Sequence, residues 1–172
     1  LYRVIKPGGV VVWVVGDATV NGSETGTSFK QALYFMECGF KLHDTMIYQT
    51  DKPPLTHNRY EQNFEYMFVL AKDKVKTFNG LREEKIWVDT TNRVKKWRRN
   101  KDGSHDTGRV GQSNSKLKDN VWHIQSGTAD DKICYEHPAV FPEKLARDHV
   151  YTWSNEGDIV YDPFSGSGTT AK

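Results

Sequence analysis

The chain has 172 residues, of which 37% are hydrophobic, and its 24 lysines and arginines against 22 aspartates and glutamates give a formal net charge of +2. This length suits one domain with a sizeable core, or a core that carries a small insertion. No apolar run approaches the ~18 residues of a membrane span, and no signal peptide opens the chain. We therefore expect a cytoplasmic protein without a membrane partner.

The two cysteines, Cys38 and Cys134, lie far apart and have no CxxC spacing. They predict neither a disulfide framework nor a zinc site. Because neither follows a proline, a covalent cysteine mechanism of the kind used to methylate cytosine carbon 5 is not expected. We predict no metal centre.

The first quarter of the chain predicts part of a covered sheet. Leu1–Lys6 has the spacing of a last helical turn, which Pro7-Gly8-Gly9 ends. Val10–Val15 is a continuous apolar run bounded by turn residues. Such a run is typical of a strand buried on both faces, as in a parallel sheet covered by helices.

A helix and two strands are predicted next. Ser28 is the expected N-cap of a helix that runs to Cys38, with Phe29, Leu33 and Met36 on its apolar face. Phe40–Tyr48 and Phe64–Leu70 are rich in aromatic and β-branched residues, which indicates two strands separated by a long loop.

From Lys72 to about Ala129 apolar residues are sparse and charge is dense. Between Arg93 and Lys118 nine basic residues face only Asp102 and Asp106, and tryptophans lie within or beside the stretch. The basic residues are Arg93, Lys95, Lys96, Arg98, Arg99, Lys101, Arg109, Lys116 and Lys118. Basic and aromatic residues in this mixture suit contacts with phosphates and base edges. The alternative is a solvated loop that binds nothing.

The end of the chain combines a helix, a strand and a glycine-rich loop. Pro142–Trp153 reads as a helix, Ile159–Tyr161 as a strand, and the loop follows at Asp162–Ala171. Its spacing matches G-x-G-x-x-G/A directly after a strand, which favours a cofactor site, although a glycine turn without ligand has the same pattern. Asp162 at the strand end can accept hydrogen bonds from an ammonium group, which suits an amino-acid tail.

Three segments resemble one known family. They are Arg3–Gly9 (RVIKPGG), His137–Leu145 (HPAVFPEKL) and Gly157–Thr170 (GDIVYDPFSGSGTT). In this order they resemble the beta-class DNA amino-methyltransferases, which methylate adenine N6 or cytosine N4 with S-adenosylmethionine. The polar stretch lies where that family has its target-recognition region. By its spacing alone, His137–Leu145 favours a rigid connector before a helix over a pocket wall.

The resemblance implies an α/β fold with a Rossmann-like methyltransferase sheet, mostly parallel with an antiparallel hairpin strand, here incomplete. It implies a catalytic-core segment at 1–78, a target-recognition insertion at 79–129 and a cofactor-binding core segment at 130–172. The implied function is transfer of a methyl group from S-adenosylmethionine to the exocyclic amine of adenine or cytosine in duplex DNA.

The resemblance also implies site residues. Those expected against the cofactor are Asp162, Phe164, Gly166, Ser167, Gly168, Thr169, Thr170, Pro138, Phe141 and Pro142. Those expected on DNA are Lys95, Lys96, Trp97, Arg98, Arg99, Lys101 and Arg109. Asp17, at the end of its strand, is either a weaker pocket residue or a carboxylate that caps a loop.

The family's catalytic tetrapeptide is Asp, Asn or Ser followed by Pro-Pro and an aromatic residue, and it does not occur in the 172 residues. Lys52–Leu55 (KPPL) has the double proline alone. We expect the tetrapeptide upstream of Leu1 and an acidic ribose ligand beyond Lys172. On this interpretation the chain is truncated at both ends, lacks a central strand, binds the cofactor weakly and does not methylate DNA alone.

Two functions of other classes stay open. One is a non-catalytic DNA-binding module, and the other is a Rossmann-like methyltransferase that acts on a small molecule or a protein. Salt-dependent duplex binding would separate the DNA-directed functions from the last. The resemblance does not specify the recognition sequence, the choice between adenine and cytosine, or whether a restriction endonuclease is a partner.

Overall fold

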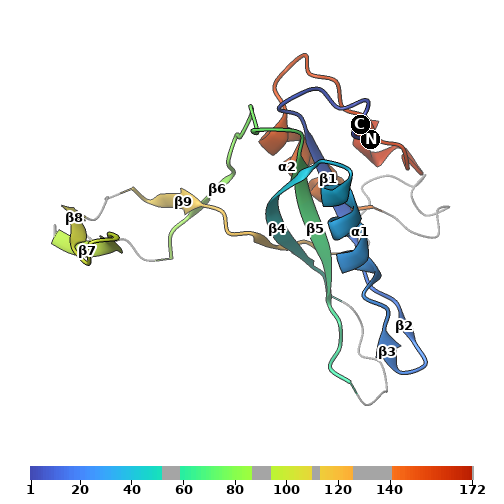
Figure 1. Ribbon diagram of the computed structural model, residues 1–172, viewed down its shortest axis with the longest axis horizontal. Coiled ribbons are helices and arrows are strands. Elements are labelled where there is room, and N and C mark those ends of the chain that lie inside the picture. Colours follow the sequence, from blue (N-terminus) through green and yellow to red (C-terminus); the bar gives the residue numbers. More distant parts are fainter. Residues whose placement is uncertain (52–58, 87–93, 110–112, 126–140, 172) are drawn as a thin grey trace. The chain divides into compact units, whose positions relative to one another are not determined.

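The computed structural model describes residues 1–51, 59–86, 94–109, 113–125 and 141–171, with the backbone alone at 94–98 and 106–109. The chain divides into two units, Leu1–Asn79 with Asp119–Lys172, and Gly80–Lys118 (Figure 1). The second unit ends at Lys118, whereas the target-recognition insertion expected from the sequence ends at residue 129. None of the described helices has the length and apolar character that a membrane crossing requires.

A four-stranded sheet forms the centre of the first unit. Its strands lie in the order β1 (Val10–Val15), β5 (Phe64–Ala71), β4 (Lys41–Gln49) and β10 (Val121–His123). β5 is antiparallel to both of its neighbours, whereas β10 is parallel to β4. Three strands thus run in one direction and β5 alone in the other. This confirms a mostly parallel sheet with an antiparallel hairpin strand, and β4 and β5 form the expected hairpin.

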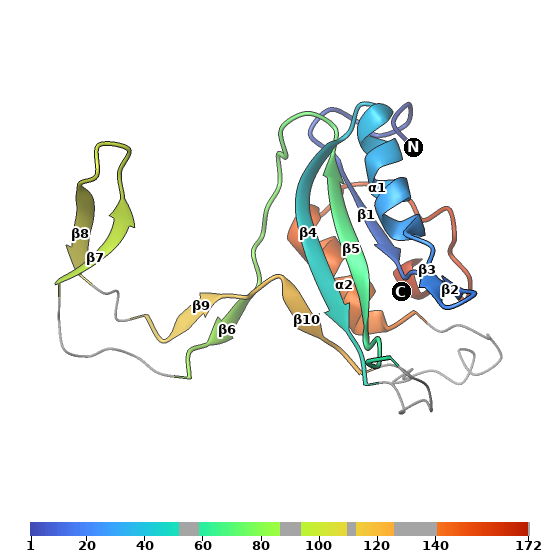
Figure 2. The same ribbon diagram turned by 60° about the horizontal axis from the view of Figure 1, so that its bottom comes forward.

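One helix covers each face of this sheet (Figure 2). α1 (Thr27–Glu37) packs through Ala32 on a cluster that includes Phe40, Phe68 and Leu70. α2 (Glu143–Trp153) confirms the helix expected at Pro142–Trp153 and packs on the opposite face, where its Leu145 is fully buried.

Aromatic and sulfur contacts hold α2 against the sheet. The His149 ring stacks on the Trp122 ring of β10 with 4.5 Å between centroids, and His149 Nε2 lies 3.1 Å from Met67 Sδ of β5. Trp122, which the sequence placed in the insertion, is 3% exposed and belongs to this core. Residues from β5, β10 and α2 therefore meet in one packed layer.

α1 is rotated relative to the sequence prediction. Its N-cap is Gly26 rather than Ser28, and Ser28 lies fully buried within the first turn. The predicted apolar face was wrong, since Phe29, Leu33 and Met36 are all exposed. The small side chains of Ser28 and Ala32 face the sheet instead, one turn apart, which lets the helix approach the strands closely.

Two strand predictions need correction. Val10–Val15 forms β1, but every residue is only half-buried, because β1 is the last strand at one side of the described sheet. Ile159–Tyr161 is not a strand, and its side chains are 84%, 48% and 63% exposed. No described strand pairs with this segment, and an apolar run without a hydrogen-bonding neighbour does not form a strand.

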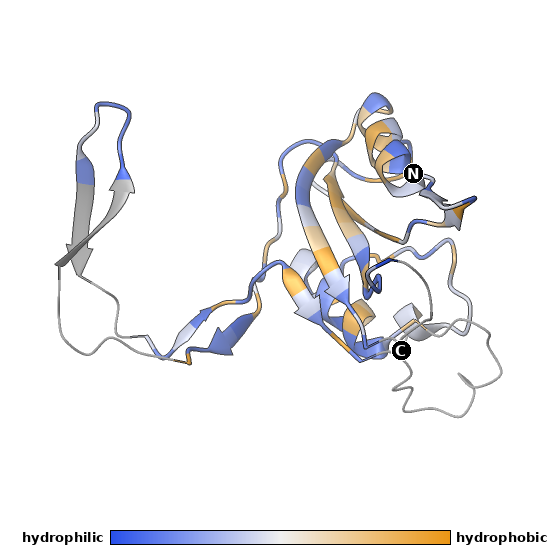
Figure 3. Ribbon diagram, turned by 90° about the horizontal axis from the view of Figure 1, so that it is seen from below, coloured by the Kyte–Doolittle hydropathy of each residue, from blue (hydrophilic) through white to orange (hydrophobic). Residues whose placement is uncertain are grey.

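The second unit consists of two short antiparallel pairs. β6 (Arg82–Glu84) pairs with β9 (Ser115–Leu117), and β7 (Val94–Arg99) pairs with β8 (His105–Arg109). Figure 3 shows mainly hydrophilic residues on β6 and β9, in contrast to the apolar stretches of β4 and β5. In the first unit, the loop after β1 forms a small hairpin of β2 (Thr19–Val20) and β3 (Ser23–Glu24).

Candidate functional site

Asp162 closes the glycine-rich loop on itself. Its Oδ1 accepts a hydrogen bond from the backbone N–H of Phe164 at 2.9 Å, and its Oδ2 accepts from the Thr170 hydroxyl at 2.6 Å. The carboxylate therefore ties the beginning of the loop to its end, eight residues later. A carboxylate has about four lone-pair sites, so these two bonds leave capacity for a ligand donor.

Glycines and a short helical turn give the loop its shape. Gly166 and Gly168 have φ angles of 50° and 83°, a region that other residues adopt only with strain. The turn η2 (Thr169–Ala171) follows, with Thr169 buried, and lies against α2. A Cβ atom added at Gly168 would have open space around it. The loop is thus supported from α2 and open on the glycine side.

The aromatic residue of the loop is exposed. The Phe164 side chain is 75% exposed, and its ring meets the Trp13 ring of β1 edge-on at 5.8 Å between centroids. Trp13 itself is fixed by donation from its indole N–H to the Gln31 side-chain oxygen of α1 at 2.6 Å. A large ring left this open to solvent is available to pack on a ligand.

The segment before α2 is only partly described. Pro142 is buried and is the N-cap of α2, and Phe141 beside it is 38% exposed. Pro138 lies outside the described residues. Ser167 is half-buried, and its hydroxyl lies 3.4 Å from that of Thr169.

Asp17 acts as a helix cap. Its Oδ2 accepts from the Ser28 hydroxyl at 2.5 Å, and its Oδ1 accepts from the Ser28 N–H and from the Thr25 hydroxyl, each at 3.2 Å. The Ser28 hydroxyl is the main reason that the pKa of Asp17 lies below its ordinary value. The second of the two interpretations, a loop-capping carboxylate, accounts for these contacts.

The residues predicted to bind DNA lie on a β hairpin. β7 carries Lys95, Lys96, Trp97, Arg98 and Arg99, while Arg109 ends β8. In the register Arg98 lies opposite Asp106, Arg99 lies opposite His105, and a bulge falls between Lys96 and Arg98. The hairpin therefore carries most of the basic residues of the insertion on two paired strands.

The hairpin turn presents one further cation. Lys101 is exposed in the turn, where Asp102 accepts hydrogen bonds from the Ser104 N–H at 2.9 Å and the Ser104 hydroxyl at 2.6 Å. These bonds lower the pKa of Asp102. The turn is thus held by its own side chains, and Lys101 is free of that framework.

The two units carry opposite net charge. Gly80–Lys118 holds eleven lysines and arginines against five aspartates and glutamates, which is a formal net charge of +6. Because the whole chain carries +2, the first unit carries −4. The overall charge of +2 is therefore the sum of one basic unit and one acidic unit.

Sequence reasoning missed a group of polar residues where β1, β4 and β10 end. Tyr48, Thr50 and Glu65 lie there, and His123 Nε2 is 3.0 Å from Asp51 Oδ1 nearby. Ligands of open α/β sheets bind at the carboxyl ends of the strands. The signal available in the sequence was a single glutamate within the apolar run Phe64–Leu70.

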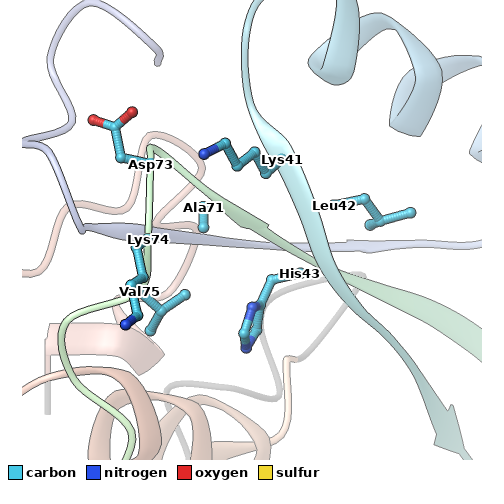
Figure 4. A pocket seen from close by; sticks show the side chains of 7 residues that line it. All are labelled: Lys41, Leu42, His43, Ala71, Asp73, Lys74 and Val75. Carbon is cyan, nitrogen blue, oxygen red and sulfur yellow. The ribbon is translucent and has the colours of Figure 1, made fainter. Parts of the chain in front are cut away.

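A depression of about 420 Å³ lies at the opposite, amino-terminal end of β4 (Figure 4). Its lining includes Lys41, His43 and Lys74, and none of the residues predicted for cofactor or DNA. Within the part of the chain that is described, no group of three or more His, Cys, Asp or Glu side chains could hold a metal ion.

The family model of DNA methylases, which covers N6 and N4 methylation, matches residues 1–172. The chain belongs to this family. The orphan methyltransferase M.BamHII of Bacillus amyloliquefaciens is 54% identical over 181 residues, an alignment that takes in all of this chain and 68% of that protein. The type II methyltransferase M.MthZI of Methanothermobacter thermautotrophicus is 26% identical, across 98% of this chain and 47% of its own length.

Solved structures of DNA methyltransferases share the fold. The PvuII DNA methyltransferase (cytosine-N4-specific) matches 96% of this chain with a TM-score of 0.67 and 17% identity, and the M1.HpyAVI–SAM complex matches 99% with 0.57 and 20%. The chain spans 55% and 64% of these two structures. At such identities the likeness concerns the fold alone.

Proposed function

We propose that this protein transfers a methyl group from S-adenosylmethionine to the exocyclic amine of adenine (N6) or cytosine (N4) in duplex DNA. The observation that carries the proposal is the loop at Asp162–Ala171, which is closed by its own carboxylate and backed by α2 in a chain of the DNA methylase family. A glycine turn without a ligand would not need an exposed aromatic ring beside it.

The loop has the chemistry that the cofactor requires. The remaining acceptor capacity of Asp162 suits an ammonium group, the exposed Phe164 ring suits an apolar chain, and the open side of Gly168 admits a ligand close to the backbone. The cofactor residues proposed are Asp162, Phe164, Gly166, Ser167, Gly168, Thr169, Thr170, Pro138, Phe141 and Pro142. When bound, S-adenosylmethionine supplies a methyl group on a sulfonium, ready for direct displacement.

The basic unit is proposed to hold the duplex. A two-stranded β ribbon fits the major groove of B-DNA, and lysines and arginines on it neutralise phosphates. The DNA residues proposed are Lys95, Lys96, Trp97, Arg98, Arg99, Lys101 and Arg109. The target base would be extruded from the stack, since its amine is inaccessible to an enzyme within the duplex.

The chain's own contribution to the reaction is positioning. Its loop residues would orient the cofactor, and its polar groups would hold the amine in line with the methyl group in a site from which water is excluded. Such a reaction acts on DNA, and we propose the cytoplasm as its compartment.

A direct test measures incorporation of labelled methyl groups from S-adenosylmethionine into duplex DNA. The assay uses the chain alone and a chimera in which the chain is joined to the part of the Bacillus relative that it does not span. We expect transfer by the chimera, and none by the chain alone because it contains no catalytic tetrapeptide. Transfer by the chimera to a protein or a small molecule, and not to DNA, would contradict the proposal. Salt-dependent duplex binding by a chimera that transfers no methyl group would favour a non-catalytic DNA-binding module.

A further inference from the structure

Three polar side chains lie on one face of the sheet where β1, β4 and β10 end. Tyr48 of β4 is directly opposite Glu65 of β5 in the antiparallel register, so their side chains share a face. Thr50 follows two residues after Tyr48, and its N–H continues the ladder by donating to the Asn63 carbonyl at 2.7 Å. Alternation along the strand places Thr50 on that face too.

One of these side chains is buried without the hydrogen bond that burial normally demands. Tyr48 is 4% exposed, Thr50 is 2% exposed and Glu65 is half-buried. The Thr50 hydroxyl has no hydrogen-bond partner, and among the described residues none is found for the Tyr48 hydroxyl or the Glu65 carboxylate. Because the great majority of buried polar groups are paired, the unpaired Thr50 hydroxyl beside the buried Tyr48 and the half-buried Glu65 indicates a site for a polar ligand.

The electrostatics indicate that Tyr48 and Glu65 act as a pair. Burial is the main cause that raises the pKa of Tyr48, and the negative charge of Glu65 raises it further. Tyr48 therefore keeps its proton and is a hydrogen-bond donor next to an acceptor. Gly16 follows β1 beside them, and a Cβ added to it would lie 3.5 Å from Glu65 Cγ, so the backbone after β1 passes close to the Glu65 side chain.

We propose that Glu65 and Tyr48 bind the Watson–Crick edge of the extruded target base. This inference rests on the proposed function and names the residues that would select the base. Adenine and cytosine both present an amino N–H beside an unprotonated ring nitrogen. Glu65 accepts from the amine and Tyr48 donates to the ring nitrogen, while the Thr50 hydroxyl can do either. In the same orientation, thymine and guanine would present a carbonyl to Glu65 and a ring N–H to Tyr48, so both bonds would be mismatched.

The test is a titration of the protein with deoxynucleosides, followed by backbone amide chemical shifts. We expect deoxyadenosine or deoxycytidine to shift the amides of Tyr48, Thr50 and Glu65, and thymidine to leave them unchanged. Tyr48→Phe and Glu65→Gln should each weaken nucleoside binding roughly tenfold, the loss expected for one hydrogen bond in a buried site. Both variants keep the shape of the side chain, so the fold should be preserved.

Tyr151→Phe and Glu37→Gln are matched controls, because they make the same chemical changes at exposed positions on α2 and α1. Equal shifts with thymidine, or unchanged nucleoside affinity in Tyr48→Phe and Glu65→Gln, would overturn the inference. Shifts at these amides with S-adenosylmethionine in place of nucleosides would assign the site to the cofactor and overturn it as well. Nucleoside binding here without methyl transfer by the chimera would instead count against the proposed function alone.

Discussion

The charge of the Gly80–Lys118 unit gives a quantitative prediction for DNA binding. Each phosphate neutralised by a lysine or arginine contributes about −0.9 to the slope of log affinity against log salt. Six of the residues proposed to contact DNA are cations: Lys95, Lys96, Arg98, Arg99, Lys101 and Arg109. If each neutralises one phosphate, the slope is about −5, and the affinity falls on the order of a thousandfold between 50 and 200 mM salt.

Lys101→Gln isolates one of these contacts. Lys101 is exposed in a turn that Asp102 and Ser104 hold, so the substitution removes a charge and leaves the hairpin intact. The slope should become shallower by about 0.9, and the affinity at 0.1 M salt should fall roughly eightfold. Fluorescence anisotropy of a labelled duplex across a salt series measures both quantities.

The matched control is Lys30→Gln, which removes an exposed cation from α1 in the acidic unit. It should leave the slope unchanged, although it alters the net charge of the chain by the same amount. The reasoning fails if the unmodified protein has a slope shallower than about −2, or if Lys30→Gln and Lys101→Gln have equal effects. A shallow slope would mean that few phosphates are neutralised, and equal effects would mean that overall charge, and not the hairpin, governs binding.

Three further substitutions test the loop and the framework around it. Gly168→Ala should weaken S-adenosylmethionine binding in a calorimetric titration. Gly103→Ala is the control and should leave binding unchanged, because this turn glycine has nearly the same φ (84° against 83°) and equally open space. Equal losses of affinity in the two variants would indicate a general effect of backbone strain. Ser28→Ala should lower the free energy of unfolding by about 1.5–3 kcal/mol at neutral pH, because it removes the hydrogen bond from the Ser28 hydroxyl to the Asp17 carboxylate. Because hydrogen bonding holds the pKa of Asp17 below 3.8 in the folded state, this difference should shrink as the pH falls below that value. Leu145→Ala, in a fully buried position, should cost about 2–5 kcal/mol in urea unfolding, and a cost under about 1 kcal/mol would mean that α2 is not packed as described.

The sequence predicted the elements of the first unit more reliably than the faces they present. The order of strand, helix, strand, loop and strand follows from local patterns, and the structure confirms it through β1, α1, β4 and β5. Local patterns did not predict the orientation of α1, because its bulky apolar residues indicated a buried face that is in fact exposed. The close approach of helix and sheet instead favours Ser28 and Ala32, and that choice depends on the Asp17 carboxylate after β1.

The segment Ile159–Tyr161 shows a second limit of local patterns. Its composition is that of a strand, but a strand is defined by the neighbour to which it bonds, and no described strand lies beside it. Tyr48, Thr50 and Glu65 show the same limit for a site. Each residue is unremarkable in its own strand, and only the register Tyr48↔Glu65 makes them a group.

The charges of the two units divide the proposed tasks between them. A unit of net charge −4 repels a phosphate backbone, so the acidic unit is suited to a neutral base and the basic unit to the duplex that carries it. Glu65 adds to this division, because a half-buried carboxylate that forms no ion pair with any described residue disfavours phosphate and favours an amino N–H. If so, Glu65→Gln should reduce the preference for amino bases over keto bases without changing the salt slope of duplex binding. If Glu65→Gln changes the salt slope, Glu65 influences the contacts with phosphates. Base recognition and duplex binding would then not be separate tasks of the two units.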